Sequence, residues 1–176
     1  PAGLGIYASF ILRWDEPGEL GAAFSLLPLA AGLASAEAIL DSAGLAARLK
    51  WPNDVVYDRK TLGGILTEGA FRPAGPGYAI VGVGINVNHE AGDFPGELRE
   101  IATSIRLVTG RPADRDRLLA CLCRALDSWY NSLIREGREA IIRAYEDRMA
   151  FSRGHGVRLA TAQGETAGIY LGLTPD

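Results

Sequence analysis

Both lysines of the chain, Lys50 and Lys60, fall within one short stretch, LKWPNDVVYDRKTLGGILTEG (49–69), and the other sixteen basic residues are all arginines. A lysine ammonium is a compact point charge, whereas an arginine guanidinium is a wider planar fork. A crowded anionic centre would therefore favour lysine over arginine, and this stretch is a candidate for such a site. The count alone also allows two unconnected surface lysines.

Glycine recurs in the two apolar segments that follow, LGGIL (62–66) and GVGIN (82–86). Because glycine weakens a strand, its repeated use indicates that another group approaches the backbone there. Bulges or tight strand crossings would explain the same glycines without a ligand. GVGIN is not a dinucleotide-binding fingerprint, since no helix is predicted after it. We expect KWPND (50–54), LGGIL and GVGIN to be neighbours if their strands pair in one sheet.

Most of the elements that must position these motifs are predicted to be strands, because apolar and polar residues alternate in them. The predicted strands are 5–14, 47–51, 54–58, 62–69 and 77–88, with the third and fourth joined at Arg59 and Lys60. Two further strands are predicted within 156–173 about a turn at Gln163 and Gly164. Short loops between the strands favour an α+β fold with an antiparallel or mixed sheet over repeated βαβ units.

Helical periodicity predicts three helices packed on this sheet. The first runs from Ser25, as its N-cap, to about Ser42, and Gly44 is placed to end it. The other two cover Asp114 to about Glu136 and Arg138 to Met149. The apolar face predicted for the longer one consists of Leu118, Leu122, Ala125, Leu126, Trp129 and Leu133.

The composition limits the classes of protein to which the chain can belong. Its 176 residues are 48% hydrophobic and 22% charged, as in a soluble globular domain with a small appendage. A net charge of −3 without a Lys/Arg-rich arm argues against nucleic-acid binding. The uncharged run 21–36 contains Pro28 and Gly32 and is too short for a membrane span, so we expect a buried helix.

The two cysteines, Cys121 and Cys123, fall in the longest predicted helix. Residues two apart on a helix point to opposite sides, so these thiols could neither pair with each other nor share a metal. We expect both thiols to be buried, and such cysteines suit the reducing cytoplasm.

KWPND, followed by GGIL and then by VGVGINVN (81–88), resembles the catalytic core of biotin protein ligases, which attach biotin to carboxylase carrier domains. The similarity continues through ATSI (102–105) and DRDRLLACLCRAL (114–126). It implies a catalytic domain over residues 1–150 with a mixed, largely antiparallel sheet and packed helices, as in class II tRNA synthetases. Residues 151–176 would then begin a small C-terminal SH3-like β domain.

The resemblance also implies a reaction and a set of ligands. The biotin carboxylate would attack the α-phosphate of ATP to give biotinyl-AMP and pyrophosphate, and a lysine of a biotin carboxyl carrier domain would then displace AMP. Lys50 would be the catalytic lysine that contacts the biotin carboxylate and the adenylate phosphate. Mg²⁺ would arrive with ATP and have few protein ligands, and no protein metal site is expected.

The remaining site residues are assigned by the same motifs. Gly82, Val83 and Gly84 would admit biotin close to the backbone, with Gly64 behind the same pocket and Asn86 near the adenosine. In the segment after Lys50, Trp51 and Pro52 would shape the strand end, whereas Asn53 and Asp54 would hold the loop by side-chain to backbone hydrogen bonds.

The chain also departs from the family pattern. Thr61 stands where the family has a second lysine, so Lys60 is given no catalytic role. The Gly- and Arg-rich loop of the family would lie just upstream of Pro1, so we expect a fragment that lacks this loop and a helix-turn-helix domain. Because the resemblance implies that the loop's arginines supply positive charge for adenylation, we expect the fragment to be poorly active or inactive. His89 and His155 are expected at the surface, and Glu68 is given a solvated or structural role. Two rivals stay open, a non-catalytic biotin or adenylate sensor and a lipoate ligase, and a homodimer is possible.

Overall fold

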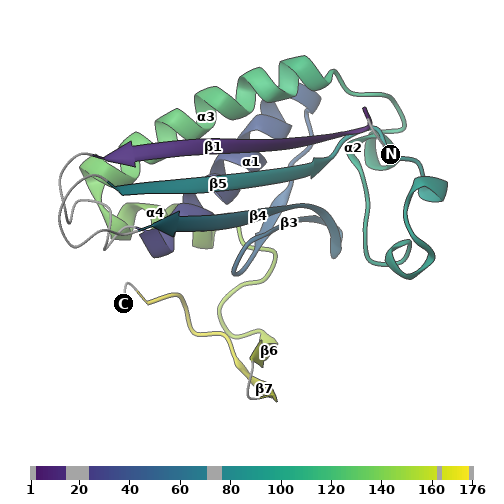
Figure 1. Cartoon of the computed structure of the whole chain (residues 1–176). Helices are drawn as coiled ribbons and strands as arrows, with labels where there is room; N and C mark the ends of the chain where they lie inside the picture. Colours follow the sequence, from purple (N-terminus) through teal and green to yellow (C-terminus); the bar gives the residue numbers. More distant parts are fainter. Residues whose placement is uncertain (1–2, 15–23, 71–76, 162–163, 175–176) are drawn as a thin grey trace.

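The computed structural model describes residues 3–14, 24–70, 77–161 and 164–174. Five antiparallel strands form the main sheet in the order β1-β5-β4-β3-β2 (Figure 1). This antiparallel sheet with packed helices confirms the predicted α+β fold. The strands are β1 (Gly5–Trp14), β2 (Arg48–Lys50), β3 (Asp54–Tyr57), β4 (Lys60–Ala70) and β5 (Gly77–Asn86).

Helices cover one face of the sheet and leave the other open (Figure 1). The covering helices are α1 (Leu27–Ala43), α3 (Arg115–Glu136) and α4 (Arg138–Asp147). The connection from β5 to α3 holds the short helix α2 (Ile105–Thr109) and two 3₁₀ turns, η2 (Ala91–Asp93) and η3 (Gly96–Leu98). A further 3₁₀ turn, η1 (Phe24–Leu26), precedes α1.

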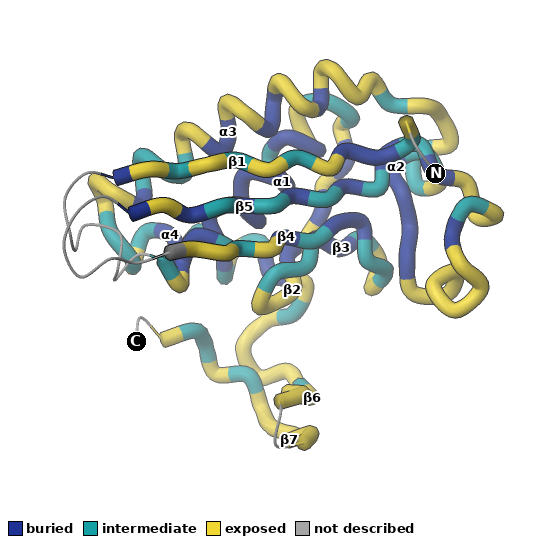
Figure 2. Tube along the Cα trace, viewed as in Figure 1, coloured by how far each residue is buried: buried dark blue, intermediate teal, exposed yellow. Residues whose placement is uncertain are grey.

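The strands alternate between the two faces, as the two-residue period of a β-strand requires. In β1, Ile6 packs in the core, whereas Tyr7 on the open face is 74% exposed. The alternating exposure can be followed along β1 in Figure 2. The open face therefore carries polar groups, glycines and a few exposed apolar side chains, and the opposite face forms the core with the helices.

Helix α1 is the central core helix, because most of its residues from Leu27 to Ile39 are buried. By length and composition alone the segment Phe24–Ala43 could cross a membrane, but 67% of its apolar window is buried by the rest of the fold. The expected end of the helix is confirmed, since Gly44 is left-handed with φ 69°. The predicted N-cap Ser25 is wrong: Ser25 lies in η1, Leu26 is the N-cap, and Pro28 occupies the first turn.

Helix α3 begins as predicted, with the Asp114 carboxylate accepting hydrogen bonds from the N–H groups of Asp116 and Arg117, both at 3.0 Å. Its predicted apolar face is buried except at Trp129, which is half-buried and donates to Glu37 at 2.9 Å. Cys121 is buried but Cys123 is exposed, and both are free, so the prediction of two buried thiols is wrong for Cys123.

The turn between β3 and β4 consists of Asp58 and Arg59, one residue earlier than predicted. Both residues have positive φ, 44° and 68°, as the two central residues of a tight hairpin turn do. On the other side of β3, the peptide bond between Trp51 and Pro52 is cis.

The C-terminal hairpin, β6 (Gly156–Thr161) and β7 (Gly164–Ile169), forms a separate two-stranded sheet. Of the turn predicted here, Gln163 lies outside the described residues and Gly164 begins β7. The Glu146 carboxylate on α4 accepts hydrogen bonds from Arg153, the Tyr170 hydroxyl and the Leu173 N–H at 2.8–2.9 Å. The domain division at residue 150 stays a prediction.

Candidate functional site

One transverse row of residues links the three motifs across the open face of the sheet. Lys50 of β2 pairs in register with Asp54 of β3, which pairs with Gly64 of β4. Gly64 pairs with Gly84 of β5, and Gly84 pairs with Tyr7 of β1. Directly opposed residues of antiparallel strands share a face. The expectation that KWPND, LGGIL and GVGIN lie side by side is therefore confirmed.

Three glycines in this region are not required by the packing of the protein itself. A Cβ on Gly64, Gly82 or Gly84 would meet its nearest atom at 3.9, 3.5 or 3.7 Å, which is ordinary van der Waals contact. Gly63 differs, because its Cβ would lie 2.5 Å from the carbonyl oxygen of Gly84. Close approach of the paired β5 backbone thus explains Gly63, whereas packing within the protein does not explain Gly64, Gly82 and Gly84.

The ammonium of Lys50 lies 3.3 Å from the Asp54 carboxylate, and its side chain is 57% exposed. Since Asp54 is on the neighbouring strand, this ion pair draws the ammonium toward Gly64. Neighbouring strands are about 4.8 Å apart, so Lys50 and Gly64 are separated by about 10 Å at their Cα atoms. An exposed pair of this kind contributes little to stability and can exchange its partner for another anion.

The turn after Lys50 is fastened to β4 by Asn53. Its side-chain amide donates to the Ile65 carbonyl at 2.8 Å, and the Ile65 N–H donates to the Asn53 carbonyl at 2.9 Å. The expected side-chain to backbone bond of Asn53 is thus present, although it reaches another strand. Asp54 instead pairs with Lys50, and Trp51 is 43% exposed.

A shallow depression of about 340 Å³ lies over the glycines. Its open-face wall comes from β1, β4 and β5 and consists of Tyr7, Ser9, Gly64, Leu66, Gly82 and Gly84. The side chain of Val83 is buried with the core, so this residue can offer a ligand only its backbone.

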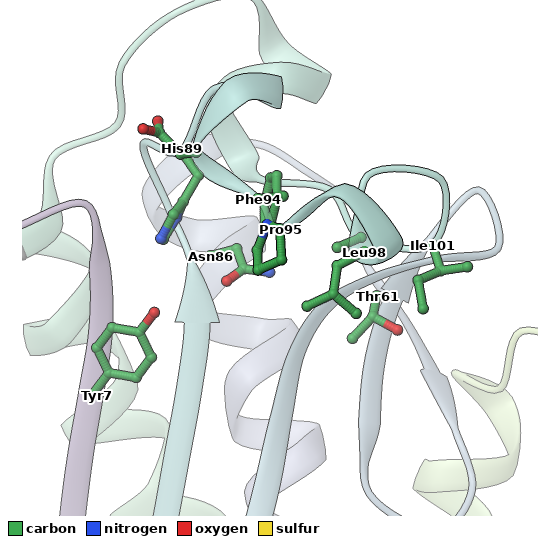
Figure 3. A pocket seen from close by; sticks show the side chains of 10 residues that line it. Tyr7, Thr61, Asn86, His89, Phe94, Pro95, Leu98 and Ile101 are labelled. Carbon is green, nitrogen blue, oxygen red and sulfur yellow. The ribbon is translucent and has the colours of Figure 1, made fainter. Parts of the chain in front are cut away.

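A second cavity, of about 410 Å³, is shown in Figure 3 and shares Tyr7 with the first. Asn86 lies at the end of β5 in its wall, together with Thr61 at the start of β4. The segment 89–102 supplies the rest of the lining, namely His89, Asp93, Phe94, Pro95, Leu98, Ile101 and Ala102. The two hollows therefore meet at Tyr7, one over the glycines and the other beside Asn86.

No protein-family model matches the chain. The Paracoccus denitrificans protein named biotin–[acetyl-CoA-carboxylase] ligase is 33% identical over 174 residues, which cover 96% of this chain and 70% of that protein. The chain belongs to the biotin protein ligase family. The Bacillus subtilis bifunctional ligase/repressor BirA is also 33% identical, over 97% of this chain, but the chain spans only 51% of that protein.

Solved structures of the biotin protein ligase family share the fold. The Aquifex aeolicus biotin protein ligase in complex with biotin and ATP superposes with a TM-score of 0.82 at 30% identity, covering 98% of this chain and 68% of that one. The similarity therefore extends over the sheet, the helices and the described hairpin.

Sequence reasoning missed several residues around the second cavity, and it was wrong about His89, which is only 3% exposed. His89 follows polar residues that suggested a loop surface, but its ring stacks on Phe94 with centroids 5.3 Å apart. The only local signal was ATSI (102–105), because Ser104 of that motif donates to the His89 carbonyl at 2.6 Å. His155, in contrast, is exposed as predicted.

Proposed function

We propose that the protein activates biotin with ATP to form biotinyl-AMP and transfers the biotinyl group to a lysine of a biotin carboxyl carrier domain. The observation that carries this proposal is the row in which Lys50, ion-paired with Asp54, shares the open face with glycines that the fold does not itself require. Membership of the biotin protein ligase family supports the same reaction.

Biotin is assigned to the depression over Gly64, Gly82 and Gly84. A fused ring system can lie against a strand only where no side chains project, and these three positions supply such a floor. The neighbouring side chains of Tyr7 and Leu66 are exposed and apolar, so they can cover the ring edges. The backbone N–H and C=O groups of the sheet remain paired beneath the ligand.

The adenosine of ATP is assigned to the adjoining cavity beside Asn86. The walls formed by Phe94, Pro95 and Leu98 are apolar, as the faces of a base require, and Thr61 and Asn86 offer polar groups. Tyr7 borders both hollows, so the carboxylate of biotin and the α-phosphate can meet between them.

Lys50 is assigned the charge that this meeting requires. A biotin carboxylate oxygen attacks the α-phosphorus, the bond to the bridging oxygen breaks, and pyrophosphate leaves with the electron pair. Negative charge crowds at one point in that transition state, and a fixed ammonium there lowers the barrier. In the second step the carrier amine attacks the acyl carbon, loses a proton and releases AMP.

ATP phosphates would hold Mg²⁺, which retains water and phosphate ligands at such sites. Within the described ranges, no three His, Cys, Asp or Glu side chains gather as a metal site, so we assign no protein ligand to the ion.

A cytoplasmic location and a homodimer are also proposed. Strand β1 lies at the sheet edge and could pair with a second copy, which light scattering after size exclusion would detect.

Incubation with biotin, ATP and Mg²⁺, followed by mass spectrometry of the small molecules, tests the proposed activity. We expect biotinyl-AMP and pyrophosphate in equal amounts, and biotinylation when a carrier domain is added. Binding of biotin and ATP without biotinyl-AMP would favour the sensor instead. Adenylation of lipoate in preference to biotin would favour a lipoate ligase.

A further inference from the structure

His89 is a buried imidazole in the wall of the second cavity. The residue is 3% exposed, and its Nδ1 has no hydrogen-bond partner among the described residues. An unsatisfied buried polar atom is costly, and native proteins retain few of them. Separately, His89 lines the second cavity, and Figure 3 shows one of its two ring nitrogens on the side of the cavity where Tyr7 and Asn86 lie.

The His89 ring packs against Phe94, and the His89 backbone is also anchored. Phe94 stacks against it at an interplanar angle of 27°, and Ser104 fastens its carbonyl. A Cβ on Gly5 would lie 3.1 Å from its Cε1 and 3.0 Å from the Tyr7 ring, so glycine at this position makes room for both rings. The imidazole is therefore stacked on Phe94 and anchored through its own backbone in the wall of the cavity.

Burial lowers the pKa of His89, while the Asp93 carboxylate opposes that shift. The imidazole is thus neutral near pH 7, with one N–H donor and one acceptor lone pair. A hydroxyl group can donate and accept, so it can pair with either tautomer. The ribose of a nucleotide offers such hydroxyls, and His89 borders the cavity assigned to adenosine rather than the glycine floor.

We propose that His89 hydrogen-bonds a ribose hydroxyl of the bound nucleotide and thereby makes the protein select ribonucleotides over deoxyribonucleotides. This inference rests on the proposed function, because it assigns the second cavity to the nucleotide. The contact gives the cavity-facing nitrogen of the imidazole a partner in the nucleotide complex, and it leaves biotin on the glycines untouched.

Calorimetric titration tests the inference with α,β-methylene-ATP, in which the carbon bridge prevents adenylation, at saturating biotin and Mg²⁺. His89→Phe keeps the stacking ring but removes the hydrogen bond, and we expect a Kd about tenfold higher, equivalent to about 1.4 kcal/mol. His89→Gln should restore most of the affinity. His155→Phe, at the exposed histidine of the hairpin, is the matched control and should leave the Kd unchanged.

The 2′-deoxy and 3′-deoxy forms of the same nucleotide identify the bonded group. One of them should bind the parent about tenfold more weakly, with no further loss in His89→Phe. If the deoxynucleotide and the His89→Phe substitution weaken binding additively, the ribose contact is wrong. An unchanged Kd in His89→Phe, or an equal loss of biotin affinity in that variant, would also overturn it. If these results occur while the parent still forms biotinyl-AMP, only this inference fails. A parent that binds no nucleotide overturns both proposals.

Discussion

At Gly64, Gly82 and Gly84 the fold leaves room for a side chain that the sequence does not use. Glycine in a strand costs roughly 0.5–1 kcal/mol relative to alanine, so three such positions on one face carry a stability penalty. The proposed binding of biotin against the backbone would account for that penalty. Gly63, one residue away from Gly64, is instead required by the carbonyl of Gly84.

Gly84→Ala should therefore preserve or slightly raise the melting temperature, because the methyl group meets its nearest protein atom at 3.7 Å. The same methyl group should weaken biotin binding by about tenfold, or about 1.4 kcal/mol, because it occupies the floor of the depression. Calorimetry with biotin and thermal denaturation measure the two effects. Gly63→Ala is the control, and it should destabilise the fold by about 1–3 kcal/mol. Unchanged biotin affinity in Gly84→Ala would move the biotin site elsewhere.

The sequence predicted candidate site residues that belong to short motifs. It missed residues whose place at the site depends on contacts with other segments of the chain. Lys50, Gly64, Gly84 and Asn86 belong to short motifs, and the register places the first three of them in one row. His89 was misassigned because its burial comes from Phe94 and from Ser104. No periodicity near His89 reports those contacts.

Among the elements, α4 connects the C-terminal hairpin to the strand that bears Lys50. Glu146 near its end accepts three hydrogen bonds from the hairpin segment. The chain just beyond it pairs with β2, since the Leu49 N–H donates to the Arg148 carbonyl at 2.9 Å and the Ala150 N–H donates to the Leu49 carbonyl at 2.8 Å. The hairpin segment is therefore attached to α4 only a few residues before the chain pairs with β2.

Glu146→Ala should release the hairpin without unfolding the sheet. The Leu173 amide loses its acceptor, so we expect its hydrogen exchange to accelerate by about tenfold or more, as in local opening. Hydrogen exchange read by NMR measures this. Glu139→Ala removes an exposed carboxylate from the same helix and should change nothing in the hairpin. Equal exchange rates at Leu173 in both variants would contradict the docking role of Glu146.

The same carboxylate predicts a dependence on pH. Partial burial alone would raise the pKa of Glu146, but the hydrogen bonds from Leu173, Arg153 and Tyr170 outweigh it and hold this pKa below its usual value. The stabilisation is therefore fully present above the unfolded pKa of about 4.3 and is lost as pH falls through the lower folded value. Urea denaturation should show a gap between parent and Glu146→Ala at pH 7 that closes under more acidic conditions. A gap that widens on acidification would contradict this sign.

Element boundaries show where local propensity was overridden. Ser25 has a side chain suited to an N-cap, yet it lies inside the 3₁₀ turn η1, and α1 begins two residues later. The β3–β4 turn lies at Asp58 and Arg59, and without a glycine or asparagine its position could not be read from composition. The end of α1 at Gly44 and the start of α3 at Asp114 were predictable from single residues. Gly44 adopts the left-handed backbone conformation, and the Asp114 side chain caps the first turn.

For the whole molecule, the strand order β1-β5-β4-β3-β2 is the feature that assembles the site. The pairing of β5 with both β1 and β4 brings Tyr7 beside the glycines. Neither the alternation nor the turns specify that β1 pairs with β5, because the two strands are far apart in sequence. The family resemblance predicted the fold, but only the strand register of the structure shows that Lys50, Gly64, Gly84 and Tyr7 lie in one row.

Ligands that bind the folded chain should stabilise it as a whole. At about 100 times the Kd, biotin should add about 2.7 kcal/mol to the free energy of unfolding, and the melting temperature should rise by several degrees. Differential scanning fluorimetry with and without biotin measures the shift. Gly84→Ala at the same biotin concentration should show a markedly smaller rise, and an undiminished rise would argue that biotin binds away from the glycine floor.

The most direct test of the proposed reaction is single-turnover formation of biotinyl-AMP by the parent, Lys50→Arg and Lys60→Arg. Both variants keep the positive charge, but Lys50→Arg changes its shape beside Asp54 on the open face, and Lys60 lies just after the β3–β4 turn. We predict that Lys50→Arg is at least about tenfold slower than the parent, a loss of about 1.4 kcal/mol or more in transition-state stabilisation, while Lys60→Arg is unchanged. Circular dichroism would establish that both variants fold. A Lys50→Arg variant as fast as the parent would contradict the proposed role of Lys50, and a parent that forms no biotinyl-AMP would contradict the proposed reaction.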